Sequence, residues 1–221
     1  MKSLPSPLLF ALLLAAALSW AQLRDSLGFA GSVSEGLIRV YSARFGAESR
    51  GYLERWRQNA LKQKTLRATD QALLVHVNDY INQVRFVEDL AHWGVEDYWA
   101  TPAETVASNG GDCEDYSIAK YFLLKELGVP IDRLRLTYVN STKLGQAHMV
   151  LAYYPMPDAE PLVLDNLISS VLPASQRTDL VPVYSFNDEE VWVEVRGKSG
   201  LPRQIRNWSA LVERLEREAR L

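Results

Sequence analysis

The stretch Gly110-Gly111-Asp112-Cys113-Glu114-Asp115-Tyr116 contains the single cysteine of the 221-residue chain and opens a strongly apolar segment. Asp112 is a favoured N-cap residue, and Asp115 follows three residues later in a capping-box relation. Gly128 marks the end of the helix. The positions between are mostly apolar, which is typical of a helix buried on most sides. The sequence therefore predicts a central helix that begins at Cys113.

The thiol of Cys113 has two interpretations at this position. A cysteine at a helix N-terminus lies at the positive end of the helix dipole, which lowers the pKa of the thiol and favours the nucleophilic thiolate. A buried, inert cysteine is the alternative, and it is common where the surroundings are apolar. The neighbouring residues and the cellular compartment have to decide between them.

Residues 1–21 have the pattern of a secretory signal peptide. Lys2 precedes an apolar run, residues 8–18, that is short for a membrane span. Small residues at Ser19 and Ala21 predict cleavage after Ala21, with an uncleaved anchor as the alternative. An exported chain with one cysteine can form no internal disulfide, so the thiol does not staple the fold. This favours a catalytic role for Cys113.

Residues 22–221 are predicted to form a single domain, with a helical N-terminal lobe at 22–68 and a catalytic core at 69–221. The hydrophobic content of 48% is enough for a core. The net charge of -3 gives no reason to expect nucleic acid or an anionic membrane surface as a partner. The chain shows no repeat, low-complexity segment or linker.

Apolar residues at helical spacing predict helices over residues 33–45 and 52–66, a long helix over residues 69–91, and a last helix from about Asn207. Thr69 or Asp70 would cap the long helix. Residues 93–111 are predicted to be an aromatic loop followed by one helical turn before Gly110, and the aromatic residues either line a substrate groove or pack in the core. His76 and His92 have no partner pattern, so structural or surface roles are predicted for both.

Alternating residues predict strands at 134–141, 147–154, 162–166, 181–184 and 191–195. Along the second strand His148 shares a face with Val150, and along the third Asp165 shares a face with Val163. If these two strands pair in antiparallel fashion, His148 and Asp165 lie opposite or diagonal to one another. The geometry allows a hydrogen bond between them.

A thiol nucleophile needs a base to take its proton and an acceptor to orient that base. Cys113, His148 and Asp165 supply these three parts. Taken singly, a histidine on a strand is more often structural, and an aspartate at a strand end is more often a turn former. Together, in matched structural contexts, they predict a Cys-His-Asp catalytic triad.

Three carboxylates, those of Asp112, Glu114 and Asp115, surround the thiol and disfavour its thiolate form. Helix capping explains one or two of them. A hard cation would explain all three, because Ca2+ takes carboxylate oxygens and would offset their charge.

Four blocks of the sequence resemble the bacterial transglutaminase-like cysteine proteinases of the LapG type. The blocks are Trp99-x-Thr101-Pro102-x-Glu104, the run from Gly111 to Tyr121, the run from Ala147 to Leu151, and Leu164-Asp165-Asn166. The similarity spans residues 72–187, and the Gly-Asp-Cys-Glu-Asp-Tyr block is quite specific.

This resemblance implies a papain-like, transglutaminase-related α+β fold, with a helical N-terminal part packed against an antiparallel sheet. It implies a calcium-dependent periplasmic cysteine protease that clips the N-terminal region of a large surface adhesin and so releases biofilm cells. It also implies sequestration by an inner-membrane cyclic-di-GMP receptor of the LapD type. The triad falls on Cys113, His148 and Asp165, and the calcium ligands fall on Asp112, Glu114 and Asp115.

Two other functions are compatible with the same residues. A transglutaminase or amidase forms the same thioester, and only the acceptor, an amine or water, separates it from a protease. A non-catalytic binding module would keep the fold with a vestigial triad.

Overall fold

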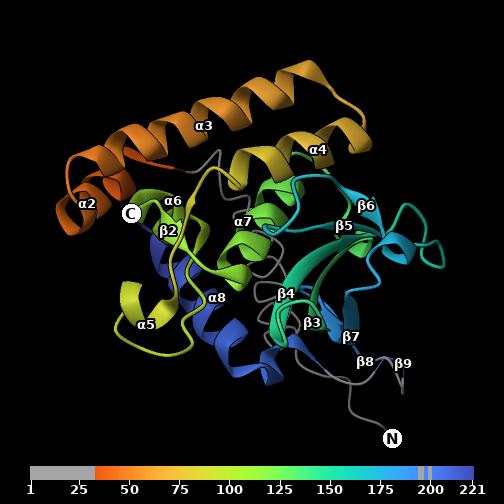
Figure 1. The fold of residues 1–221 in the computed structure, drawn as a ribbon. Coiled ribbons are helices and arrows are strands. Elements are labelled where there is room, and N and C mark those ends of the chain that lie inside the picture. The colour runs from red at the N-terminus through yellow and green to blue at the C-terminus, as the bar shows by residue number, and fades with distance from the viewer. Residues whose placement is uncertain (1–32, 194–196, 199–200) are drawn as a thin grey trace, which may run out of the picture.

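Residues 33–193, 197–198 and 201–221 are described by the computed structural model, in which helices pack against an antiparallel sheet (Figure 1). The predicted signal peptide and its cleavage site lie outside these residues. The helices are α2 (Glu35–Phe45), α3 (Glu48–Leu66), α4 (Asp70–Ile81), α5 (Asp89–His92), α6 (Pro102–Ser108), α7 (Cys113–Glu126) and α8 (Arg206–Glu218). The strands are β1 (Arg85–Phe86), β2 (Gly110–Gly111), β3 (Leu134–Ser141), β4 (Gln146–Tyr153), β5 (Leu162–Leu164), β6 (Leu172–Pro173), β7 (Leu180–Phe186), β8 (Val191–Val193) and β9 (Gly197–Lys198).

The main sheet has the order β6-β5-β4-β3-β7-β8-β9, and every neighbouring pair is antiparallel. The pair β3–β4 forms its centre, with Leu134 opposite Tyr153 and Ser141 opposite Gln146. The predicted strands therefore form, although residues 194–195 of the last one lie outside the described residues. The α+β fold predicted from the sequence is confirmed.

Helix α7 begins at Cys113 as predicted and lies between the sheet and the helices α3 and α4 in Figure 1. The carboxylate of Asp115 accepts a hydrogen bond from the backbone N–H of Asp112 at 3.3 Å, which closes the first turn. Farther along, the ring of Phe122 stacks on Trp208 of α8 with centroids 5.9 Å apart. The central helix is thus held from both the sheet side and the C-terminal helix.

The prediction of one long helix over residues 69–91 is wrong. Helix α4 is capped by Thr69, as predicted, but ends at Ile81. The chain then becomes extended because β1 pairs with β2, placing Arg85 beside Gly110. Apolar residues beyond Ile81 continue the helical spacing by coincidence, and pairing with a distant segment decides their conformation.

Helix α6 is longer than the single turn predicted within residues 93–111. Thr101 and Glu104 form a reciprocal capping box, and Pro102 occupies the first helical position. The Thr-Pro-x-Glu pattern at residues 101–104 is a local signal for a helix start, so the beginning of this helix could be predicted from the sequence.

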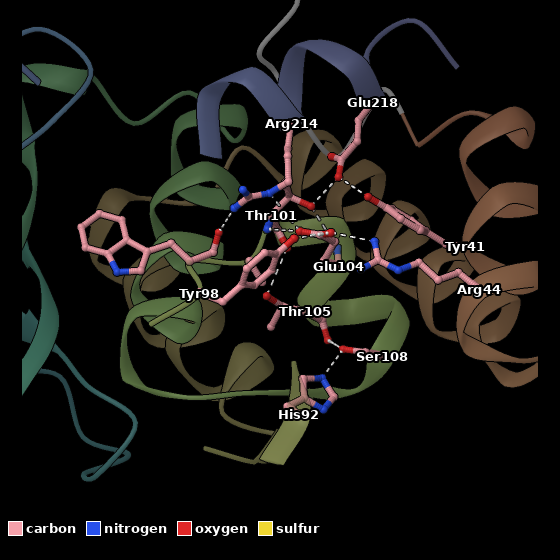
Figure 2. A network of polar contacts seen from close by, with 12 residues as sticks. Tyr41, Arg44, His92, Tyr98, Thr101, Glu104, Thr105, Ser108, Arg214 and Glu218 are labelled. Atoms are coloured by element: carbon pink, nitrogen blue, oxygen red, sulfur yellow. Dashed lines mark hydrogen bonds and ion pairs between the residues drawn. The ribbon is translucent and has the colours of Figure 1, made fainter. Parts of the chain in front are cut away.

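A buried polar network joins helices α2, α6 and α8 (Figure 2). The hydroxyls of Tyr41 and Thr101 both donate to the carboxyl group of Glu218. Glu104 accepts hydrogen bonds from Arg44 and from the Tyr98 hydroxyl, each at 2.9 Å. The C-terminal helix is therefore fixed to the loop before α6 by polar contacts as well as by apolar packing.

The ionisation of Glu218 is predicted to destabilise the protein. Burial raises the pKa of Glu218 from 4.5 to about 7. Because the folded-state pKa is raised, the stabilising contribution of this group is complete below pH 4.5 and is lost as the pH rises through 7. Glu218→Gln keeps a neutral acceptor for Tyr41 and Thr101. Its free energy of unfolding should therefore rise relative to that of wild type across this pH range, by on the order of 2 kcal/mol.

Urea denaturation of both proteins at pH 5 and pH 8 measures this difference. Glu213→Gln, at an exposed position of the same helix, is the control and should show no such trend. An equal difference between Glu218→Gln and wild type at the two pH values would contradict the prediction.

Candidate active site and metal centre

His148 and Asp165 meet at the junction of β4 and β5. The strands pair with Leu151 opposite Leu164, so Asp165 continues β5 to a position diagonal to His148. His148 Nε2 lies 2.8 Å from Asp165 Oδ1, and the two residues are only 3% and 1% exposed. The predicted antiparallel pairing and the hydrogen bond it allows are both present.

Asp165 is held by further contacts on both of its oxygens. Oδ1 also accepts the backbone N–H of Leu167 at 3.1 Å, and Oδ2 accepts Nη2 of Arg177 at 2.7 Å. Its backbone carbonyl accepts the side-chain amide of Asn82 from the end of α4 at 2.9 Å. These contacts fix both the peptide and the carboxylate plane.

The charge state of Asp165 fixes the tautomer of His148. Burial acts to raise the pKa of Asp165, but the hydrogen bonds from His148, Leu167 and Arg177 outweigh it and hold the pKa at about 2. An ionised carboxylate can only accept hydrogen bonds, so Nε2 of His148 carries the proton. In the neutral imidazole, Nδ1 then carries the free lone pair that a general base requires.

Cys113 lines the same cavity as His148. The cavity has a volume of about 530 Å3, and Trp99, Tyr138 and Tyr184 form part of its wall. The first turn of α7 is fixed to β4, because the hydroxyl of Ser117 shares its proton between the carbonyl oxygens of Cys113 at 2.9 Å and Met149 at 3.0 Å. Of the aromatic residues that precede the cysteine, Trp99 both lines this cavity and stacks on Phe186 in the core.

The prediction that the helix N-terminus lowers the pKa of the Cys113 thiol is wrong for this geometry. Burial raises that pKa, and the negative charge of Glu114 raises it further, while the backbone amide of Met149 acts in the opposite direction. The thiol donates to Glu114 Oε2 at 3.1 Å rather than to the imidazole of His148. Burial and the neighbouring carboxylates together thus outweigh the helix dipole.

An acidic cluster surrounds this first turn. It contains the three carboxylates named from the sequence, Asp112, Glu114 and Asp115, together with Asp89 and Asp97. Oxygens of Asp89, Asp112 and Asp115 lie within 4.8 Å of one another, and so do those of Asp89, Asp97 and Glu114. Five carboxylates from three segments of the chain therefore converge beside the thiol.

The cluster fits a hard cation. Oδ1 of Asp89 and Oδ1 of Asp112 are buried and have no hydrogen-bond partner among the residues that the structure describes. By contrast, Asp115 Oδ1 accepts the backbone N–H of Ala100 at 2.7 Å. A set of carboxylate oxygens, some without a donor, is the ligand chemistry that Ca2+ prefers.

The pKa values of the cluster show the electrostatic strain of the carboxylates by themselves. Burial raises the pKa of Asp112 to about 8, with Glu114 adding to the effect, and burial raises the pKa of Asp89 to about 6. Burial likewise raises the pKa values of Glu114 and Asp115. A divalent cation would offset the charges that these shifts reflect.

Sequence reasoning missed Asp89, Asp97 and Arg177. Asp89 comes close to the first turn of α7 because β1 pairs with β2. Its carboxylate accepts the backbone N–H of Tyr98. Arg177 lies twelve residues after Asp165 in an irregular segment. No local pattern of spacing or capping marks any of these three residues.

The two other histidines have partners outside the cavity. Nε2 of His76 lies 3.0 Å from Asn59 Oδ1, and Nε2 of His92 lies 2.9 Å from the hydroxyl of Ser108. These contacts agree with the structural roles predicted for both.

No helix within the described part of the chain has the length and apolar character needed to cross a membrane.

Comparison with known proteins identifies the family. No curated protein sequence gave a match. Three solved structures of Legionella pneumophila LapG are 39% identical to the chain and cover 83% of it: one with a TM-score of 0.72 over 98% of LapG, an EGTA-treated one at 0.73 over 98%, and a calcium-bound one at 0.71 over 99%. Residues 50–199 match the family described as bacterial transglutaminase-like cysteine proteinase BTLCP. The chain therefore belongs to the bacterial transglutaminase-like cysteine proteinase family.

Proposed function

We propose that the chain is a calcium-dependent cysteine endopeptidase in which Cys113, His148 and Asp165 form the catalytic triad. The observation that carries this proposal is the buried hydrogen bond between His148 Nε2 and Asp165 Oδ1, beside a cavity that Cys113 also lines. Membership of a cysteine proteinase family supports it.

In the proposed mechanism, His148 Nδ1 takes the proton of Cys113, and the sulfur attacks the scissile carbonyl carbon. The backbone N–H of Cys113 donates to the oxyanion. The imidazolium then protonates the leaving amine, which leaves an acyl thioester on the enzyme. Water, deprotonated by His148, hydrolyses the thioester and restores the thiol. Asp165 holds the imidazole in the required tautomer throughout.

Asp112, Glu114 and Asp115 are the proposed calcium ligands, and we add Asp89 and Asp97 from the geometry of the cluster. Bound Ca2+ would offset the negative charge beside the thiol and hold together the segments that meet there. The calcium-bound structure of Legionella pneumophila LapG supports this choice of ion.

The proposed substrate is the N-terminal region of a large surface adhesin, whose cleavage releases the adhesin and promotes biofilm dispersal. The proposed regulator is an inner-membrane cyclic-di-GMP receptor of the LapD type that sequesters the protease. Residues 1–21 are the proposed signal peptide for export to the periplasm, and residues 22–221 the proposed single domain. Similarity to LapG supports each of these assignments.

Replacement of the nucleophile is expected to abolish proteolysis without unfolding the protein. Cys113→Ala removes the sulfur, and alanine is well tolerated in a first helical turn. Mass spectrometry of culture supernatants, comparing wild type with Cys113→Ala, should reveal adhesin fragments in the wild type alone. A purified, folded Cys113→Ala protein that still cleaves the adhesin fragment would rule out a cysteine-protease mechanism.

Within the triad, the base is expected to matter more than the residue that orients it. His148→Ala should leave almost no activity, whereas Asp165→Asn should remain about 10- to 100-fold faster than His148→Ala. The measurement is kcat for cleavage of a purified adhesin fragment. Wild-type rates in both variants would show that the strand pair is only structural.

Chelation of calcium is expected to lower both activity and thermal stability. Ca2+ binds the folded site and not the unfolded chain, so EGTA should lower Tm and excess Ca2+ should restore it better than Mg2+. Asp112→Ala, Glu114→Ala and Asp89→Asn should each weaken the rise in Tm on adding Ca2+. Asp132→Ala, at an exposed carboxylate outside the cluster, is the control and should respond as wild type. If EGTA changes neither quantity in the wild type, the carboxylates are helix caps and the metal assignment is wrong.

A further inference from the structure

Arg177 is a buried arginine that contacts Asp165 on the side away from His148. Its side chain is 2% exposed. Nη2 donates to Asp165 Oδ2 at 2.7 Å, while Nε and Nη2 donate to the two oxygens of Asp179, each at 2.9 Å. One guanidinium group therefore joins the proposed triad carboxylate to a second carboxylate.

The backbone around Arg177 makes this contact rigid. The Arg177 N–H donates to the carbonyl of Ala174 at 2.9 Å, and the N–H of Leu180 donates to the carbonyl of Arg177 at 3.0 Å. The carbonyl of Asp179 accepts the N–H of Thr142 at 2.8 Å, just after the end of β3. The guanidinium is thus tied to the frame of the sheet on which His148 lies.

We propose that Arg177 is a positioning residue for catalysis, which fixes the carboxylate plane of Asp165 so that Oδ1 holds His148 in the Nε2–H tautomer. The inference rests on the proposed function of the triad. It assigns to Arg177 no contact with substrate or with the reacting atoms.

The planar fork is the feature that suits this role. With one oxygen anchored on His148 and Leu167 and the other on Arg177, the carboxylate cannot rotate without losing a buried hydrogen bond. A lysine would bring the charge but not the two-sided geometry. Orientation, rather than charge alone, is the expected contribution of Arg177.

Asp179 balances the charge of the guanidinium. A lone arginine beside Asp165 would cancel the negative charge that stabilises the imidazolium formed during catalysis. Together Asp165, Arg177 and Asp179 carry a net charge of about -1 when all three are ionised. The second carboxylate thus lets Arg177 orient Asp165 while the site keeps its negative charge.

Lys120 provides an internal comparison. It is the other buried cation near Asp165, on the central helix α7, and burial lowers its pKa to about 7. Its Nζ has no hydrogen-bond partner among the described residues, so it acts on the carboxylate by its charge alone, and that charge is partial near pH 7. Substitution of Lys120 therefore tests the effect of a nearby positive charge, whereas substitution of Arg177 tests the effect of the guanidinium hydrogen bonds.

The test measures the tautomer of His148 by 15N NMR of the imidazole nitrogens in the purified, calcium-loaded protein at neutral pH. The chain has three histidines, so His148→Ala assigns the signal and His76 and His92 serve as references. Wild type should show the single Nε2–H tautomer. Arg177→Gln should show a mixture of both tautomers. Arg177→Lys should keep a larger share of the Nε2–H tautomer than Arg177→Gln does. Asp179→Asn weakens the ion pair that holds Arg177, and it carries less risk to folding because the Asp179 side chain is 23% exposed. It should also lower the share of the Nε2–H tautomer.

Arg133→Gln is the matched control, because Arg133 pairs with Asp70 away from the cavity and is 40% exposed. It should keep the wild-type tautomer. Folded Arg177→Gln and Asp179→Asn proteins that both retain the wild-type tautomer would overturn the proposal. The proposal would also be overturned if Lys120→Met lost as much of the Nε2–H tautomer as Arg177→Gln, because charge alone would then explain the effect.

A second measurement separates this inference from the proposed function. The rate of Cys113 alkylation by iodoacetamide at pH 7 should fall about 10-fold in Arg177→Gln, by analogy with the effect of residues that orient metal ligands. An unchanged rate in that variant would contradict the positioning role. If wild type and His148→Ala react at equal rates, the proposed triad fails, while the NMR result still reports whether Arg177 fixes the imidazole.

Discussion

The contact between the first turn of α7 and strand β4 places the thiol and the imidazole at one cavity. The hydroxyl of Ser117 shares its proton between the carbonyls of Cys113 and Met149, so a single side chain joins the helix start to the strand next to His148. The buried apolar face of α7 supplies the packing that holds this contact in place. Any shift of the helix along its axis would change the distance between the thiol and the imidazole.

The same turn concentrates negative charge, and this is the main cost of the arrangement. Five carboxylates converge on a residue that must itself become negative in the proposed mechanism. The helix dipole contributes only about 0.3–1 kcal/mol and cannot offset them. Burial raises the pKa values of Asp112 and Asp89, and the neighbouring carboxylates raise them further. A bound cation is the simplest means of balancing these charges, and it would couple the reactivity of the thiol to the presence of the metal.

The segment from Asp97 to Thr101 connects this charged region to the C-terminal helix. The N–H of Ala100 donates to Asp115, while Asp97 accepts a hydrogen bond from Asn207 at 2.7 Å. Arg214 of α8 donates to the carbonyl of Trp99. Trp99 lines the cavity, so α8 stabilises one wall of the candidate active site although it contributes no group to the proposed chemistry.

The sequence by itself determined the features that depend on local rules. The start of α7 at Cys113 follows from capping by Asp112 and Asp115, and the approach of His148 to Asp165 follows from the two-residue repeat of paired strands. Capping and side-chain alternation act over a few residues, so they can be recognised without knowledge of the fold. The Thr101 capping box of α6 belongs to the same class and was equally readable.

Only the tertiary structure decided the features that depend on contacts between distant segments. Helix α4 stops at Ile81 because the residues after it pair with Gly110 and Gly111. Asp89 and Asp97 join the acidic cluster, and Arg177 reaches Asp165, through loops whose courses no periodic pattern specifies. The pKa of the Cys113 thiol rises for the same reason. Burial and the sum of nearby charges set that pKa, and both are properties of the folded protein rather than of the residues next to it in the sequence.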